Sequence, residues 1–71
     1  MERLLRYSLE HERVIRLMLL TEGNLAQVNA RVIAYDAEKI EFITTRSPRP
    51  QVVPRADLLA ADFRKGDDGQ I

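Results

Sequence analysis

The sequence predicts a mainly β fold, a small five-stranded barrel with a short N-terminal helix. Five short segments of alternating apolar and polar residues follow one another with brief connections. A proline-rich segment at 46–50 separates the third from the fourth, and an expected single helical turn at 55–57 precedes the fifth. Five strands are too few for a sandwich and are typical of a partly closed barrel.

The length of 71 residues indicates one domain, which we expect over 1–64, followed by a flexible polar tail over 65–71. A chain this short buries only about 60% of its unfolded surface, so its core is small. The sequence contains no cysteine, and neither a disulfide nor a thiolate metal site can stabilise it. Stability must therefore come from packing or from self-association.

We expect the first element to be a helix over about 2–10. Met1, Leu5 and Leu9 recur every fourth residue and form one apolar stripe, with Leu4 beside it. A helix of this length is unstable on its own and must pack against the rest of the chain. Its expected role is therefore to cover the open end of the barrel rather than to bind a partner.

The first two strands are expected over about 13–20 and 25–35, joined by a turn at 21–24. The apolar residues that alternate toward one face are Ile15, Leu17 and Leu19 in the first strand and Val28, Ala30 and Val32 in the second. Within the turn, Gly23 or Asn24 can take a positive φ.

The alternation in the second strand reverses after Val32. Ile33 and Tyr35 are apolar on the opposite parity. Because successive side chains of a strand point to opposite faces, such a reversal predicts a bulge or a sharp bend.

The last three strands are expected over about 39–45, 51–54 and 58–63. In the first of these the residues that alternate toward the core are Ile40, Phe42 and Thr44. Pro48 and Pro50 belong to the connecting loop, because proline cannot donate a hydrogen bond to a neighbouring strand.

A short helix, a charged turn and an alternating strand are expected at 4–17, with the sequence LLRYSLEHERVIRL, and a one-turn helix before a closing strand at 53–62, VPRADLLAAD. In this order the chain resembles the SH3-like and Sm-like small barrels. Within that group it looks most similar to the barrel of the WYL domains of bacterial transcription regulators. The resemblance covers about 4–63 and implies this barrel fold.

The chain departs from the WYL pattern at positions that this family uses to bind nucleotides or single-stranded nucleic acid. The Trp-Tyr-Leu signature would fall near 39–42, where the sequence reads KIEF. Asp57 stands where a basic residue is expected before the closing strand. The resemblance therefore implies the fold but not the binding site.

Charge and hydropathy exclude several classes of protein. Eleven basic and eleven acidic residues give no net charge, whereas a non-specific nucleic-acid binder normally carries a basic excess. The longest apolar run is at 17–20, far short of the roughly 20 residues that a membrane span needs. The first residues lack the apolar core of a signal peptide. We therefore expect a cytoplasmic protein without membrane association.

Few residues suit catalysis or metal binding. His11 is the only histidine and there is no cysteine, so a transition-metal site would have to be rich in carboxylates, which is unusual for zinc. Ser8 precedes His11 by three residues, but no glycine elbow surrounds it. No glycine-rich phosphate loop occurs. We expect a protein that is not an enzyme and that binds no cofactor or metal.

One stretch departs from the neutral charge of the chain. Arg46, Arg49 and Arg55 fall in a segment without an acidic residue, and arginine suits bidentate contacts to phosphate. Tyr35 is a nearby aromatic residue that could stack on a base. These four residues are the candidate ligand-binding set, for a nucleotide or single-stranded nucleic acid. The alternative is that the arginines keep a proline-rich loop hydrated and pair with Asp57 or neighbouring acids.

Self-association is the third interpretation. Contiguous apolar patches on the outward parity of strands usually mark an interface. The expected interface residues are Val14, Met18, Leu20, Ile33 and Ile43. A partly closed barrel also has two unpaired edges, and symmetric dimers are the commonest closed assemblies. The sequence thus predicts a non-enzymatic binding or interaction module that self-associates or binds another protein, with nucleotide or nucleic-acid binding as the alternative.

Overall fold

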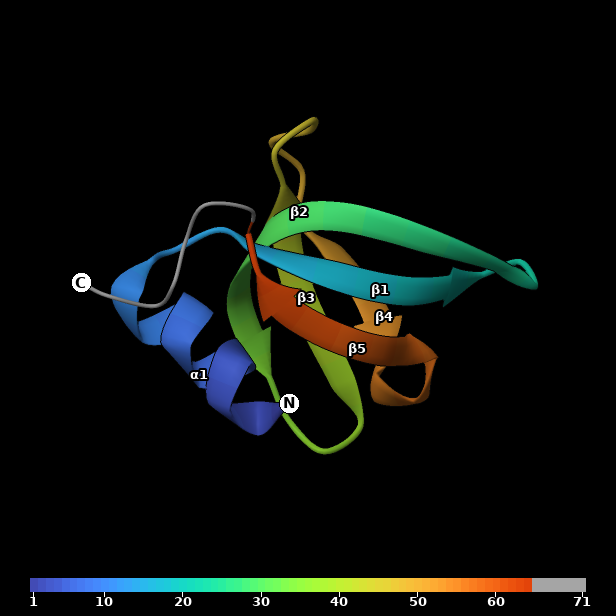
Figure 1. Cartoon of the computed structure of the whole chain (residues 1–71), viewed down its shortest axis with the longest axis horizontal. Coiled ribbons are helices and arrows are strands. Elements are labelled where there is room, and N and C mark those ends of the chain that lie inside the picture. Colours follow the sequence, from blue (N-terminus) through green and yellow to red (C-terminus); the bar gives the residue numbers. More distant parts are fainter. Residues whose placement is uncertain (65–71) are drawn as a thin grey trace.

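The computed structural model describes residues 1–64, in which one sheet of five antiparallel strands packs against a helix (Figure 1). In chain order the elements are α1 (Glu2–His11), β1 (Ile15–Thr21), β2 (Asn24–Tyr35), β3 (Lys39–Thr44), β4 (Gln51–Pro54), the 3-10 helix η1 (Arg55–Asp57) and β5 (Leu58–Phe63). The mainly β class, the five strands, the N-terminal helix and the helical turn before the last strand are confirmed. The expected tail at 65–71 lies outside the described residues.

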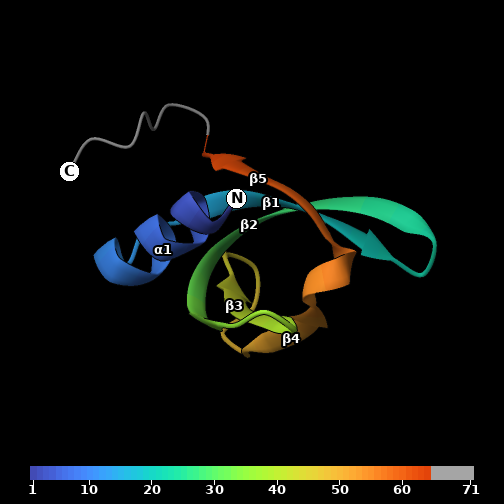
Figure 2. The ribbon, with the colours of Figure 1, turned by 90° about the horizontal axis from the view of Figure 1, so that it is seen from below.

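The strands lie in the order β4-β3-β2-β1-β5, so β4 and β5 form the two edges of the sheet. Figure 2 shows how strongly the sheet curls, with β2 curving from β1 round to β3. η1 connects the two edge strands along the chain and contacts both β1 and β3. No pairing joins β4 to β5 within residues 1–64, so closure of the sheet into a barrel remains a prediction.

A two-residue turn connects β1 to β2. Thr21 pairs with Asn24, and the residues between them, Glu22 and Gly23, have φ angles of 52° and 79°. Positive φ at both central positions matches a type I′ turn, whose twist suits an antiparallel hairpin. The prediction that Gly23 or Asn24 takes a positive φ is confirmed at Gly23. Asn24 already belongs to the strand, and Glu22 takes the second left-handed position instead.

The predicted irregularity in β2 is confirmed. Val32 pairs with Phe42, but the next pair joins Ala34 to Glu41, which leaves Ile33 as the extra residue. A bulge of this kind bends its strand and increases the local twist. It lets one long strand pair with β1 along its first half and with β3 along its second half.

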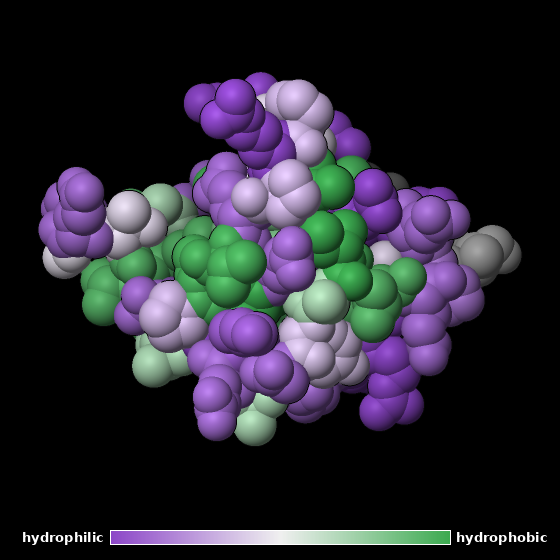
Figure 3. Space-filling view, turned by 180° about the vertical axis from the view of Figure 1, so that it is seen from behind, coloured by the Kyte–Doolittle hydropathy of each residue, from purple (hydrophilic) through white to green (hydrophobic). Residues whose placement is uncertain are grey.

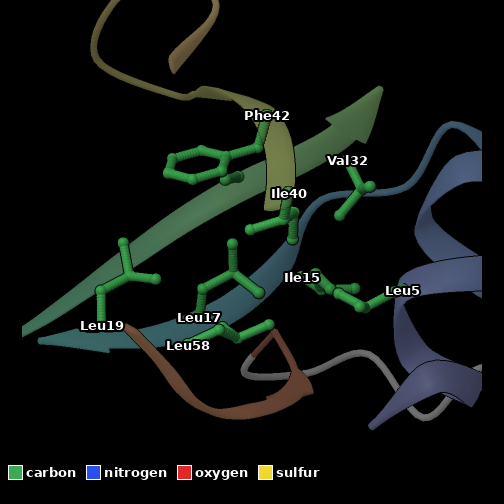
Figure 4. Close-up of a cluster of buried hydrophobic side chains, with 9 residues drawn as sticks. Leu5, Ile15, Leu17, Leu19, Val32, Ile40, Phe42 and Leu58 are labelled. Carbon is green, nitrogen blue, oxygen red and sulfur yellow. The ribbon is translucent and has the colours of Figure 1, made fainter. Parts of the chain in front are cut away.

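The core is formed by α1 and four of the strands, as Figure 4 shows. Its buried apolar residues are Leu5, Ile15, Leu17, Leu19, Ala30, Val32, Ile40, Phe42 and Leu58. The alternation predicted for the first and third strands is confirmed by their burial, except that Thr44 is only half-buried. Val28 in β2 is likewise half-buried.

The predicted apolar stripe of α1 is only partly right. Leu5 is fully buried, but Met1 and Leu9 are 49% and 37% exposed. The buried face of the helix instead combines Leu5 with Ser8, which is also fully buried. Leu4 and Tyr7 also pack against the core, so the helix is rotated from the orientation that the spacing of Met1, Leu5 and Leu9 predicts.

The Ser8 hydroxyl fills a gap in the pairing of β1 with β2. Ile15 pairs with Ala30, so the next pair in this register would join Arg13 to Val32. The Ser8 hydroxyl stands between them, where it donates to the Arg13 carbonyl at 2.7 Å and accepts from the Val32 N–H at 2.9 Å. A buried backbone N–H or C=O group without a hydrogen-bond partner is costly. Ser8 provides a partner for two such groups at the point where β1 and β2 separate.

Candidate functional site

The β3–β4 loop carries two of the four residues in the predicted ligand-binding set. Arg46 and Arg49 are both exposed. Within the loop, the backbone N–H of Arg49 donates a hydrogen bond to the Ser47 hydroxyl at 3.3 Å. Within residues 1–64, neither guanidinium group forms a hydrogen bond or an ion pair. Both arginines are therefore free to bind a ligand.

The other two predicted residues, Arg55 and Tyr35, come together at the opposite end of β3. The Arg55 Nη1 donates to the Asp36 carbonyl at 2.7 Å, and its Nη2 forms an ion pair with Glu2. Its guanidinium carbon lies 5.9 Å from the centre of the Tyr35 ring. Arg55 thus fastens the start of α1 to the β2–β3 turn. It pairs with an acid, as the alternative interpretation expected, but the partner is Glu2 rather than Asp57.

Asp36 organises the turn beside Arg55. Its carboxylate accepts hydrogen bonds from the N–H groups of Glu38 and Lys39, at 2.8 and 2.9 Å. These two hydrogen bonds hold the pKa of the Asp36 carboxyl below its ordinary value, and the bond from Glu38 has the largest effect. The positive charges of Lys39 and Arg55 act in the same direction, and partial desolvation opposes them. At this end of the sheet the Arg55 guanidinium group is thus already engaged by the Asp36 carbonyl and the Glu2 carboxylate.

A concave pocket of about 330 Å³ lies between β2 and the β3–β4 loop. Its lining residues are Gln27, Val28, Asn29, Thr44, Thr45, Arg46, Ser47 and Gln51. We call it the loop pocket. These residues, all from the described part of the chain, supply one positive charge, no carboxylate, three hydroxyl groups and three carboxamides. Of the predicted ligand-binding set it includes only Arg46.

The pairing of β2 with β3 explains why Arg46 reaches the loop pocket. Ala30 on β2 pairs with Thr44 at the end of β3, and the Thr45 N–H donates to the Asn29 carbonyl at 3.0 Å. Arg46 is the next residue along the chain, so it lies in the turn that follows β3 and lines the pocket there. Sequence reasoning missed Gln27, Asn29 and Gln51, whose contribution depends on this pairing.

A second concavity of about 330 Å³ lies on the outward face of β2, β1 and β5. Its lining residues are Arg16, Met18, Gln27, Ala60, Ala61 and Asp62. Its two charges, Arg16 and Asp62, already pair with each other at 3.3 Å. An exposed pair of this kind contributes little to stability, and it leaves the concavity without a free charge.

The predicted interface residues differ in their exposure. Leu20 is 39% exposed, and the others, Val14, Met18, Ile33 and Ile43, are half-buried. Arg31 stands directly opposite Ile43, and long arginine stems cover apolar neighbours. The outward face therefore exposes less apolar surface than the sequence pattern alone suggests.

Residues 1–64 contain no cluster of metal-ligating side chains. No three histidine, cysteine, aspartate or glutamate side chains gather there as metal ligands would. The ring of His11 lies 5.5 Å from that of Tyr7, and the Ser8 hydroxyl is engaged with two backbone groups. Neither helix in this part of the chain combines the length and the apolar content needed to cross a membrane.

Comparison of the chain with family models, with curated proteins and with solved structures found no match. The function must therefore be argued from the molecule itself.

Proposed function

We propose that this protein is a non-enzymatic interaction module that self-associates through the free edge of β5. The observation that carries the proposal is the difference between the two edges of the sheet. An unpaired edge offers backbone N–H and C=O groups to another strand unless side chains obstruct it. Of the two edges in the described chain only β5 is free of proline, and its register against β1 shifts once, at Leu59.

The β4 edge is poorly suited to pairing. Pro50 precedes the strand and Pro54 ends it, and a proline has no N–H group to donate. β5 contains no proline, and its first four residues, Leu58 to Ala61, carry no charge. Ala60 and Ala61 are small, so another strand can approach them closely. A second copy of the chain presents the same edge, and two β5 strands related by a twofold axis would pair in antiparallel orientation.

Exposed apolar residues lie near this edge. Leu59 in β5 is 45% exposed, and Leu20 and Leu25, which pair with each other on the β1–β2 hairpin, are 39% and 68% exposed. The rear face of the molecule, which lies away from β5, carries further apolar patches below the hydrophilic β3–β4 loop (Figure 3). Association through β5 would remove Leu59 from water and would compensate for the small core.

Sedimentation velocity at micromolar concentration is expected to give about twice the chain mass of 8.2 kDa. Replacement of Leu59 by lysine should yield a folded monomer, because an edge lysine opposes strand pairing. The matched control is Leu25→Lys, which places the same charge on a more exposed leucine outside β5. A folded wild-type monomer would exclude the proposal. If only Leu25→Lys dissociated the dimer, the interface would lie on the β1–β2 hairpin and not on β5.

We further propose that the curved sheet belongs to the SH3-like class of small barrels and is similar to WYL domains. The strand order, the bulge in β2 and the 3-10 turn before β5 support this assignment. The residues that WYL domains use for ligand binding are not present, so the assignment concerns the fold alone.

Binding of single-stranded nucleic acid is a second candidate function. The free, exposed guanidinium groups of Arg46 and Arg49 favour it, and Arg55 contributes nothing because it is paired with Glu2. Two phosphate contacts make the affinity depend only weakly on salt. For a single strand, the slope of log K against the logarithm of the salt concentration should be about −1.4.

We expect weak binding of a labelled oligothymidylate at low salt, measured by fluorescence anisotropy. It should disappear when Arg46 and Arg49 are both changed to alanine. The control changes Arg3 and Arg6, two exposed arginines of α1, so the net charge falls equally. Equal losses in both double variants would indicate non-specific attraction, and absence of wild-type binding at low salt would remove this candidate.

A further inference from the structure

We propose that the loop pocket binds a small, hydroxyl-rich phosphate ester, with Arg46 holding the phosphate. The inference is independent of self-association. β2, β3, β4 and the β3–β4 loop form the pocket, and no residue of β5 lines it. A dimer that pairs through β5 would leave the pocket open.

The charge of the pocket indicates an anionic ligand. Arg46 is its single charged residue, and within residues 1–64 the guanidinium group forms neither a hydrogen bond nor an ion pair. The planar guanidinium fork matches two phosphate oxygens at once. None of the lining residues within 1–64 carries a carboxylate that would repel an anion. The hydroxyl groups of Thr44, Thr45 and Ser47 can add neutral donors.

The volume and the carboxamides indicate what the phosphate is attached to. A volume of about 330 Å³ is at the small end of the range for ligand pockets and is larger than a bare phosphate requires. The side chains of Gln27, Asn29 and Gln51 each carry both donors and an acceptor. Groups that donate and accept together are suited to sugar-like hydroxyl groups, which do the same.

The lining also argues against a nucleobase. Recognition of an unpaired base normally uses an aromatic side chain on which the base stacks. The lining contains no aromatic residue. Tyr35, which the sequence suggested for stacking, packs against the core at the other end of β3, beside Arg55. A sugar phosphate therefore fits the pocket better than a nucleotide.

Nuclear magnetic resonance titration of the full chain with ribose 5-phosphate tests this inference. We expect saturable shifts of the side-chain amide signals of Gln27, Asn29 and Gln51, and of the backbone amides of the loop. Inorganic phosphate, ribose and adenosine 5′-monophosphate serve as comparison probes. Ribose 5-phosphate should bind at least about tenfold more tightly than either ribose or phosphate, because only the ester reaches both Arg46 and the carboxamides.

Arg46→Ala should weaken binding of ribose 5-phosphate by about tenfold or more, since a hydrogen bond to a charged group contributes about 1.5–3 kcal/mol. The matched control is Arg49→Ala, in the same loop but outside the lining, which should change the affinity less than twofold. Equal losses in the two variants would indicate general attraction to a basic loop and would overturn the inference. So would the absence of saturable shifts, equal affinity for inorganic phosphate, or tighter binding of adenosine 5′-monophosphate.

Discussion

Replacing Phe42 with alanine is expected to remove most or all of the stability of the fold. Phe42 is the largest fully buried side chain among the described residues, and it lies in the middle of β3, between Val32 on one neighbouring strand and Gln51 on the other. Truncation of a buried phenylalanine costs about 3–5 kcal/mol, because apolar contact is lost and a cavity remains. A domain this small has a free energy of unfolding near the lower end of about 5–15 kcal/mol.

Urea denaturation followed by circular dichroism checks this expectation. The control is Val52→Ala on β4, where the side chain is 57% exposed and the change should be within about 0.5 kcal/mol. If Phe42→Ala is unfolded without urea, Phe42→Leu provides a milder substitution that should lower the transition midpoint measurably. An unchanged midpoint in both variants at position 42 would contradict the place of Phe42 at the centre of the core.

The strands were predictable because the signals that form them are local. The alternation of apolar and polar residues correctly predicted that Leu17 and Phe42 lie in the core. The reversal of this alternation at Ile33 marks the residue at which the bulge occurs. Turn geometry was less predictable. Glu22 adopts a positive φ, which is uncommon outside glycine and asparagine, because the two-residue hairpin requires it at both positions. The pairing of Thr21 with Asn24 leaves no other residue to take that place.

The contacts between distant segments could not be predicted from spacing. Arg55 pairs with Glu2, far away in the sequence, and no periodicity relates the two residues. The four residues of the predicted ligand-binding set lie apart for a related reason. Arg46 and Arg55 are close in sequence, but β4 runs antiparallel to β3 and carries the chain from one end of β3 to the other. Of the predicted ligand-binding set, only Arg46 therefore reaches the loop pocket.

The structural role of Ser8 was not predicted from the sequence. A serine beside an apolar helix stripe suggests a boundary position, yet this one is fully buried. Its hydroxyl joins the Val32 N–H to the Arg13 carbonyl. No sequence signal marks it, because the end of the pairing beyond Ile15, which leaves two backbone groups in need of a partner, is seen only in the structure.

Ser8→Ala is expected to destabilise the fold by about 1–3 kcal/mol, because the buried Val32 N–H loses its acceptor. The sign of the change in the free energy of unfolding is informative, since alanine is a better helix former than serine by up to about 0.7 kcal/mol. If the Ser8 hydroxyl made no stabilising hydrogen bond, replacement by alanine would therefore give a more stable protein. Urea denaturation measures the sign, and hydrogen exchange at the Val32 amide should become faster in the variant. A more stable protein with unchanged exchange at Val32 would show that the hydroxyl is not the link between α1 and the sheet, and that the apolar contacts of Leu4, Leu5 and Tyr7 dock the helix.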